Sequence, residues 1–188
     1  LYEIKKKNAF VSIDQIDACN RTPTCQVTLG QVMSKGDRMD YAIQKATELG
    51  VHTIQLLISE RCEMRLKYER DQKKIEHWQS VAIAACEQCG LNIVPQVLAP
   101  MPLNDWLTSD LPTSRFVLAP HKDQANVLLN SSADIALLIG PEGGLSEDEI
   151  ATANQQQFQN WCIGERVLRT ETAPVVALSI LNFHFSSK

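Results

Sequence analysis

Residues 136–144 read Ala-Leu-Leu-Ile-Gly-Pro-Glu-Gly-Gly, and this stretch indicates the fold more clearly than any other part of the chain. Its apolar run is continuous rather than alternating, which is typical of a parallel strand that helices cover on both faces. Directly after it, Ser146 and Glu149 have the spacing of a capping box, and Leu145 and Ile150 have that of a hydrophobic staple. The sequence therefore predicts a buried strand, a rigid glycine loop and a helix in direct succession.

The same alternation of strand and helix extends over most of the chain. Apolar residues at helical spacing predict a helix from about Asp37, with Gly50 at its C-terminal cap, and a second helix over 71–89. A further helix is predicted over 175–185, with Pro174 in its first turn. Strands are predicted at 26–32, 53–58, 94–98, 116–118, 135–139 and 161–163. We therefore expect an α/β fold, with a mostly parallel sheet and helices on both of its faces.

The first residues have a different character. Residues 9–18 predict a strand, and the polar run over 19–25 is typical of a linker, so we expect a domain boundary near residue 20. The sequence opens with Leu1 and already has strand character there, which leads us to expect that it begins inside a larger protein.

Composition predicts an ordinary soluble protein located in the cytoplasm. The 188 residues are 44% hydrophobic and 21% charged, and no apolar stretch approaches the roughly 20 residues that span a bilayer. The net charge of -4 does not favour a nucleic-acid-binding protein, because such domains usually carry a basic excess. Basic residues do gather at 5–7 and over 61–74, although acidic residues dilute the second group, so a solvated mixed-charge face is the alternative there.

The six cysteines predict neither a disulfide framework nor a metal site. Cys86 and Cys89 form a CxxC pair late in a predicted helix, whereas redox pairs usually open a helix. No second pair completes a zinc site, and ligand spacing is also absent among the histidines, His52, His77, His121 and His184. We interpret Cys86 and Cys89 as packing thiols in a reducing compartment, and we expect no metal.

The loop over 140–144 is the first candidate site. Ligands of open α/β sheets bind at the carboxyl ends of the strands, where this loop must lie. Its three glycines permit positive backbone dihedrals and a close approach of the main chain to a ligand, and Pro141 stiffens the turn. The stretch matches neither a Walker A loop nor a GxGxxG fingerprint. On spacing alone, a ligand-binding loop and an ordinary strand-to-helix turn are both consistent with these residues.

The second candidate site is the polar loop that follows the predicted strand at 161–163. Two arginines, two glutamates and two threonines gather over 164–172. One interpretation is a functional loop at the edge of the sheet. The other is that Arg169 pairs with Glu171 or Glu165 on the surface, an interaction that contributes little energy.

Two motifs, GPEGGLS at 140–146 and VLRTET at 167–172, together resemble the RsmE family, whose members methylate a uridine N3 in bacterial 16S ribosomal RNA. Further matches are LGQVMSKG at 29–36, QKATELG at 44–50 and IAACEQCG at 83–90. The likeness runs in order from about residue 25 to the last residue.

The resemblance implies a SPOUT-type fold in which the C-terminal segment forms a trefoil knot, an exception to the rule against knots. It also implies S-adenosylmethionine as cofactor, a homodimer, and 16S ribosomal RNA within the assembled small subunit as substrate. Family members carry a PUA-like RNA-binding β-barrel at their N-terminus. We therefore expect residues 1–20 to be the C-terminal remnant of that domain and residues 21–188 to be the SPOUT methyltransferase domain.

Site residues carry over from the family onto matching positions. Arg169 is expected to supply a cation to the anion that develops on the uridine, and Glu142 or Glu171 to accept its proton or to orient the group that does. The cofactor is expected to lie against three loops, whose residues are Leu118, Ala119, Pro120, Ile139, Gly140, Pro141, Glu142, Gly143, Gly144, Ile163, Gly164, Leu168, Arg169, Thr170 and Thr172.

Other classes of function fit the same sequence. An RNA-binding α/β module without catalytic activity predicts no affinity for S-adenosylmethionine, and a small-molecule α/β enzyme predicts activity without RNA. A SPOUT methyltransferase that acts on a different RNA is a further alternative. Cofactor binding and methyl transfer to ribosomal subunits distinguish between these classes.

Overall fold

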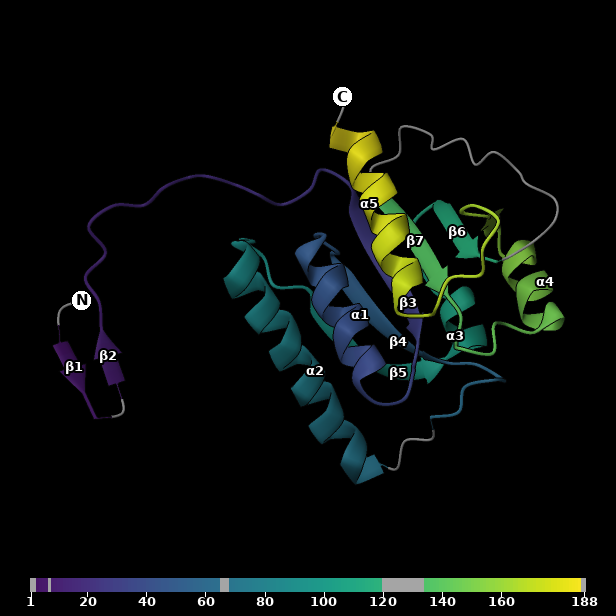
Figure 1. The fold of residues 1–188 in the computed structure, drawn as a ribbon, viewed down its shortest axis with the longest axis horizontal. Helices are drawn as coiled ribbons and strands as arrows, with labels where there is room; N and C mark the ends of the chain where they lie inside the picture. The colour runs from purple at the N-terminus through teal and green to yellow at the C-terminus, as the bar shows by residue number, and fades with distance from the viewer. Residues whose placement is uncertain (1–2, 7, 65–67, 120–133, 187–188) are drawn as a thin grey trace.

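The structure, a computed structural model, describes residues 3–6, 8–64, 68–119 and 134–186 of the chain. The N-terminal part is an antiparallel hairpin of strands β1 (Glu3–Lys5) and β2 (Asn8–Phe10). In Figure 1 this hairpin lies apart from the rest of the described chain, and residues 11–25 connect the two.

The main sheet has six strands in the order β5-β4-β3-β7-β6-β8, and every neighbouring pair is parallel. The strands are β3 (Gln26–Val32), β4 (Thr53–Ile58), β5 (Gln96–Pro102), β6 (Ser114–Leu118), β7 (Asp134–Ile139) and β8 (Gln159–Trp161). Because they run in one direction, their carboxyl ends lie along one edge of the sheet (Figure 1). The loops that follow those ends therefore meet.

Helices cover both faces of the sheet. The helices are α1 (Asp37–Glu48), α2 (Tyr68–Cys89), α3 (Leu103–Leu107), α4 (Glu147–Gln155) and α5 (Thr172–Ser186). Buried side chains of α1, α2 and α5 join one hydrophobic cluster, and those of α3 and α4 join another. Within the described residues, no helix has both the length and the apolar composition of a membrane span.

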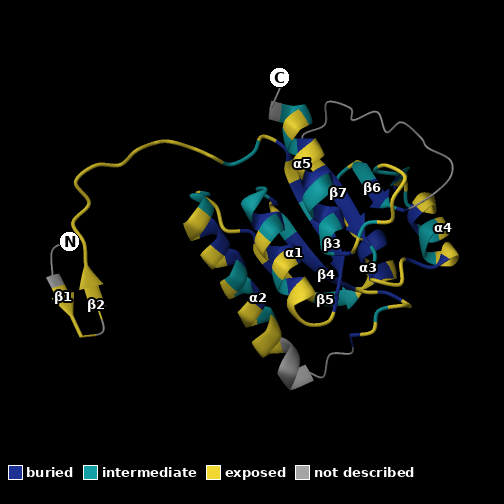
Figure 2. Cartoon of the chain, viewed as in Figure 1, coloured by how far each residue is buried: buried dark blue, intermediate teal, exposed yellow. Residues whose placement is uncertain are grey.

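The position of strand β7 between two hydrophobic clusters explains why its sequence is continuously apolar. Ile135, Leu137 and Ile139 point into the first cluster, whereas Ala136 and Leu138 belong to the second. All five side chains are at most 2% exposed, and Figure 2 shows the central strands as buried. A strand covered on both faces needs apolar residues at successive positions, so the prediction for 135–139 is confirmed.

The sequence did not indicate α3, whose five residues are too few for a periodic pattern. Its Trp106 packs directly on β3. A Cβ atom built on Gly30 would lie 2.4 Å from the Trp106 ring, so only glycine permits this approach. The helix is therefore specified by a contact between distant parts of the chain.

Most predicted elements are confirmed with small shifts at their ends. Strands β3 and β4 have the predicted bounds, and α1 begins at Asp37. Gly50 has φ of 76°, as expected of a residue that caps a helix in the left-handed conformation. Helix α2 begins at Tyr68 instead of residue 71, β5 covers 96–102 instead of 94–98, and β8 covers 159–161 instead of 161–163.

The strand predicted over residues 9–18 is wrong beyond Phe10, where β2 ends. Val11, Ile13 and Ile16 are 68%, 74% and 84% exposed. A strand needs a partner that accepts its backbone hydrogen bonds, and none of the described strands pairs with this segment. The β-branched residues that suggested a strand therefore lie in irregular chain.

Candidate functional site

A cavity of about 570 Å³ opens at the carboxyl ends of β6 and β7. Both candidate loops line it: the loop after β7 contributes 140–145, and the loop before α5 contributes 167–171. Gly143 and Arg169, which a site on these loops must bring together, share this one cavity. The volume is within the range of about 300–1,000 Å³ that is usual for sites of small organic ligands.

The loop after β7 owes its shape to two glycines in different ways. Gly144 has φ of 69°, and its N–H donates to the carbonyl of Pro141 at 2.8 Å, which closes a tight turn. Gly140 does not have a positive φ. Instead, a Cβ there would lie 3.0 Å from the Leu145 side chain and 3.2 Å from its backbone nitrogen. Of the three glycines, which permit both positive dihedrals and a close approach, Gly144 alone has a positive φ, and Gly140 allows the close approach of Leu145.

Local capping fixes the helix that follows this loop. The Ser146 hydroxyl accepts a hydrogen bond from the Glu149 N–H at 3.3 Å, and the Glu149 carboxylate accepts one from the Ser146 N–H at 2.9 Å. Leu145 is buried, and Ile150 packs against the same cluster. The predicted capping box is confirmed, and the start of α4 is fixed beside the cavity.

Thr170 joins the second loop to the first. Its buried hydroxyl donates to the Gly140 carbonyl at 2.7 Å, and it accepts a hydrogen bond from the amide of Gln31 on β3 at 3.2 Å. The N–H groups of Thr172 and Ala173 both donate to the Arg169 carbonyl at 2.9 Å, which starts α5. The two loops are thus held together by side-chain hydrogen bonds as well as by packing.

The two glutamates of the cavity differ in their partners. Glu142 accepts from Arg38 of α1 at 3.0 Å, and its side chain is 31% exposed. Glu171 is 14% exposed, and its nearest cation is Arg169 at 3.9 Å. Its Oε2 atom is buried and has no hydrogen-bond partner among the described residues. A buried carboxylate oxygen is costly to leave unbonded, so Glu171 has free capacity to accept a proton or a hydrogen bond from a ligand.

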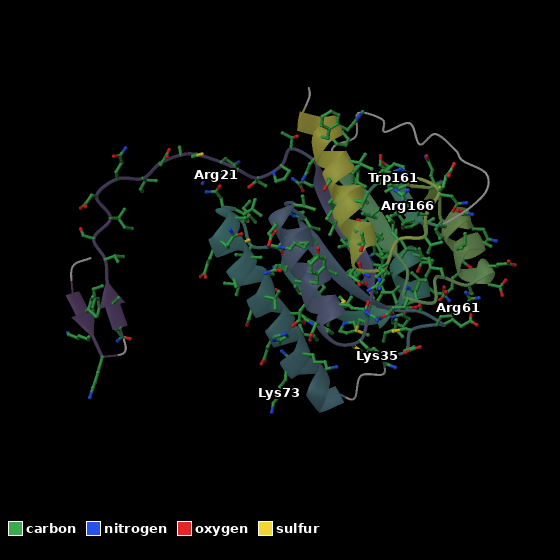
Figure 3. All side chains as sticks on the ribbon, in the orientation of Figure 1. Arg21, Lys35, Arg61, Lys73, Trp161 and Arg166 are labelled. Atoms are coloured by element: carbon green, nitrogen blue, oxygen red, sulfur yellow. The ribbon has the colours of Figure 1, made fainter. Side chains whose placement is uncertain are left out.

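Arginines surround the opening. The Arg169 side chain is 81% exposed, which leaves it free to move toward a bound molecule. Arg61, which follows β4, donates to the carbonyls of Gly143 and Leu145 at 3.0 and 3.4 Å. Figure 3 shows Arg61 and Lys35 at the end of the sheet toward which the strands point, with Arg21 at the opposite end.

Most predicted site residues that the structure describes line the cavity. These are Leu118, Ala119, Ile139, Gly140, Pro141, Glu142, Gly143, Gly144, Leu168, Arg169, Thr170 and Glu171. Ile163, Gly164 and Thr172 do not: Ile163 packs on the core, Gly164 is exposed in a turn, and Thr172 begins α5. Pro120 lies outside the described residues.

Sequence reasoning did not assign six residues that also line the cavity: Arg38, Arg61, Leu145, Ile150, Val167 and Ala173. Leu145 and Ile150 were recognised only as a helix staple, and Arg61 only as part of a mixed-charge group. Arg38 carried no signal, because its partner Glu142 is 104 residues away in the chain.

Cysteine and metal chemistry find little support at this site. Burial raises the pKa of the Cys62 thiol, with Glu142 and Glu149 adding to the effect against two opposing backbone hydrogen bonds, so the thiol stays neutral at neutral pH. Cys86 is buried, and both it and Cys89 are free thiols. In the described part of the chain, no three His, Cys, Asp or Glu side chains are arranged to hold a metal ion.

The walls of the cavity fit an organic cofactor. Leu118, Ile139 and Leu168 supply apolar surface, the two loops supply main chain, and Glu142 and Glu171 supply carboxylates. S-adenosylmethionine combines an apolar-faced adenine with hydroxyl and ammonium donors. The residues present are therefore compatible with this molecule.

Proteins of a known family match most of this chain, including both candidate loops. A family model described as RNA methyltransferase domain matches residues 20–182. The ribosomal RNA small subunit methyltransferase E of Buchnera aphidicola subsp. Schizaphis graminum is 38% identical over 85% of this chain and 65% of its own length. Its counterpart from the subspecies Acyrthosiphon pisum is 35% identical over 98% of this chain and 74% of its own length. This chain thus spans about two thirds to three quarters of these curated relatives.

A solved structure supports the fold in detail. The ribosomal RNA small subunit methyltransferase E from Neisseria gonorrhoeae, crystallised with S-adenosyl methionine, matches with a TM-score of 0.84 and 36% identity. The match covers 90% of this chain and 70% of the other. The six-stranded parallel sheet and its helices therefore occur in a known structure that binds this cofactor.

Proposed function

The chain belongs to the ribosomal RNA small subunit methyltransferase E family, and from this we propose that it transfers a methyl group from S-adenosylmethionine to N3 of a uridine in 16S ribosomal RNA. The observation that carries the proposal is that the two motif-bearing loops line one cavity and are joined by the hydrogen bond from Thr170 to Gly140. S-adenosylmethionine supplies an activated methyl group to this site when it is bound.

The backbone of the two loops and the apolar residues at the ends of β6 and β7 would hold the cofactor. Gly140, Gly143 and Gly144 have no side chains to fill the cavity, and Leu118, Ile139 and Leu168 would contact the apolar part of the ligand. Ile163, Gly164 and Thr172 do not line the cavity, and we retain them as residues that support the second loop.

Methyl transfer to uridine N3 requires that the ring nitrogen lose its proton and that the resulting negative charge be stabilised. Arg169 is exposed at the opening and supplies the cation that stabilises this charge. Its present partner, Glu171, is 3.9 Å away, so little interaction is lost when Arg169 turns to the substrate.

Between the two glutamates, Glu171 is the better proton acceptor. Glu142 already accepts a hydrogen bond from Arg38 at 3.0 Å, so one of its carboxylate oxygens is engaged. Glu171 is a lining residue of the same cavity, and its Oε2 atom has no hydrogen-bond partner among the described residues. We therefore assign the acceptor role to Glu171 and an orienting role to Glu142, whose ion pair ties the glycine loop to α1.

Several finer properties follow from family membership, and we include them in the proposal. The C-terminal segment forms a trefoil knot, the protein acts as a homodimer in the cytoplasm, and the substrate is the assembled small subunit. Residues 1–20 are the end of a PUA-like RNA-binding domain, and residues 21–188 form the SPOUT domain. Support for this division comes from the family match, which begins at residue 20.

The test is methyl transfer to ribosomal particles from a strain that lacks the enzyme. The chain is incubated with tritiated S-adenosylmethionine and either small subunits or free 16S ribosomal RNA, and the nucleosides are identified by mass spectrometry. We expect N3-methyluridine, and more of it from assembled subunits. Saturable cofactor binding without label in either substrate would contradict the proposed substrate, and no cofactor binding would contradict the whole proposal.

A further inference from the structure

Gln31 is a polar side chain in the middle of the sheet. It lies on β3, opposite Ile139 of β7 and Leu56 of β4, and only 1% of the residue is exposed. Its Nε2 atom donates to the backbone carbonyl of Val32 at 3.1 Å and to the Thr170 hydroxyl at 3.2 Å. Its Oε1 atom is buried and has no hydrogen-bond partner among the described residues.

A buried amide with an unbonded oxygen destabilises the fold, so we expect this side chain to have a specific function. An apolar side chain of similar size would fill the position without leaving a buried acceptor unbonded. Hydrophobic core residues occupy the positions two residues away in both directions, Leu29 on the same strand and Met33 directly after it. The feature that distinguishes position 31 from these two is its contact with Thr170 of the distant second loop.

The chemistry of the partner atoms determines which atom donates in the hydrogen bonds that Gln31 and Thr170 make. The Val32 carbonyl can only accept, so the amide atom beside it must be the nitrogen. That nitrogen can only donate, so Thr170 Oγ1 accepts from it. The single Thr170 hydroxyl proton is then directed to the Gly140 carbonyl, at 2.7 Å.

We infer that Gln31 is a positioning residue for the cofactor cavity. It orients the Thr170 hydroxyl toward Gly140 and thereby holds the two cavity loops at the separation in which they bind S-adenosylmethionine. Both Gly140 and Thr170 line the cavity, whereas Gln31 lies behind them. The inference rests on the proposed function, because it assumes that this cofactor is the ligand.

The chain contains a matched control, Gln55 on the adjacent strand β4. Gln55 is also buried, at 6% exposure, and its Nε2 atom donates to the carbonyls of Leu56 and Ala99 at 3.0 and 2.7 Å. Neither of these bonds reaches a cavity loop. Replacement of either glutamine removes a buried amide from the sheet, but only Gln31 affects the link between Thr170 and Gly140.

The first experiment measures S-adenosylmethionine binding by calorimetry for the wild-type chain, Gln31→Met and Gln55→Met. We expect Gln31→Met to raise the Kd about tenfold, the loss that corresponds to one hydrogen bond of ordinary strength. Gln55→Met is expected to lower Tm without a change in Kd. An unchanged Kd in Gln31→Met, or an equal rise in both variants, would overturn the inference.

A second variant gives a readout that a purely structural role does not produce. In Gln31→Glu, the protonated carboxyl can still donate to Thr170, whereas the ionised carboxylate can only accept and draws the Thr170 proton away from Gly140. Cofactor affinity of this variant is therefore expected to be near that of the wild type at low pH and to fall as pH rises. A pH profile parallel to that of the wild type would contradict the direction of the hydrogen bonds.

Thr170→Val removes the same link without a change in the sheet, so it tests the inference even where a Gln31 variant does not fold. It should weaken binding to a similar extent, and the double variant with Gln31→Met should be no weaker than either single variant. Full additivity would overturn the inference. Failure of the wild-type chain itself to bind S-adenosylmethionine would instead overturn the proposed function on which the inference rests.

Discussion

The two ends of the main sheet each carry a hollow of similar size but different chemistry. The cavity at the carboxyl end has a volume of about 570 Å³, and a hollow between the linker and α5 at the amino end has about 510 Å³. The first contains Arg38, Arg61, Arg169, Glu142 and Glu171, supplied by four separate segments. The second is lined largely by residues 20–24 and the turn after α1.

Volume alone therefore does not identify a site. At the amino end Arg21 donates to the Gly90 carbonyl and Asn182 donates to the Leu49 carbonyl. The buried lining atom without a hydrogen-bond partner among the described residues is there the neutral hydroxyl of Thr22. At the carboxyl end a buried oxygen of Glu171 has no described donor, and Arg169 is largely exposed. Charged groups with free bonding capacity distinguish the cavity that we assign to methyl transfer.

The largest effect is expected from Arg169→Ala. Loss of the cation that stabilises the uridine anion should lower kcat about 100-fold or more, whereas cofactor affinity should change little. Arg21→Ala at the amino end is the matched control and should leave kcat unchanged. Methyl transfer to small subunits measures the rates, and calorimetry measures the affinity. An Arg169→Ala enzyme with wild-type kcat would remove Arg169 from the catalytic residues.

The next largest effect on kcat is expected from Glu171→Gln, and Glu142→Gln should have a smaller one. Glu171→Gln removes the proposed proton acceptor and should lower kcat about 100-fold. Glu142→Gln breaks a half-exposed ion pair with Arg38 and should lower kcat less than about tenfold. The two variants are compared by their kcat at saturating cofactor. The reverse order of effects would transfer the acceptor role to Glu142.

At the amino end, Gly50→Ala should change stability and not binding. Gly50 has φ of 76°, and a Cβ there would lie 2.2 Å from the Pro23 ring, so the variant should be less stable by about 1–3 kcal/mol. Denaturant unfolding measures this loss. Below the unfolding transition, the Kd of the Gly50→Ala variant for S-adenosylmethionine is expected to equal that of the wild type. A weaker Kd would mean that the two ends of the sheet are coupled.

The smallest effect concerns a thiol at the amino end. Cys25 is 2% exposed, and burial, with a contribution from Asp134, raises its pKa to about 11. At pH 8 about one such thiol in a thousand is ionised, so alkylation should be slow. Exposed Cys19, in the linker, should react first. Mass spectrometry of iodoacetamide-treated native protein gives the order of modification, and early modification of Cys25 would contradict the burial of its thiol.

Local sequence patterns predicted most of the fold. The capping box at Ser146 and Glu149, the continuous apolar run of β7 and the glycine cap at Gly50 each depend on residues a few positions apart. The short helix α3 and the irregular segment after Phe10 could not be predicted in this way. Their conformations depend on whether a distant partner, such as Gly30 for Trp106, is present.

The candidate site was predicted as far as its loops, including Leu118 and Ala119 at the end of β6. The motifs at 140–146 and 167–172 identified residues that line the cavity, but not the contacts that arrange them. Arg61 reaches Gly143 across 82 residues of sequence, and Gln31 reaches Thr170 across 139. Pairs at such separations leave no periodic signal, so Arg61 and Gln31 became site residues only through the geometry.

Hydrogen–deuterium exchange with and without S-adenosylmethionine tests most directly whether the two glycine-bearing loops hold the cofactor. We expect slower exchange over 139–146 and 164–173 when the cofactor is present, with unchanged exchange over 20–25 and 48–52 at the opposite end of the sheet. Protection that is absent from either cavity loop, or that appears at the amino end instead, would contradict the proposed site.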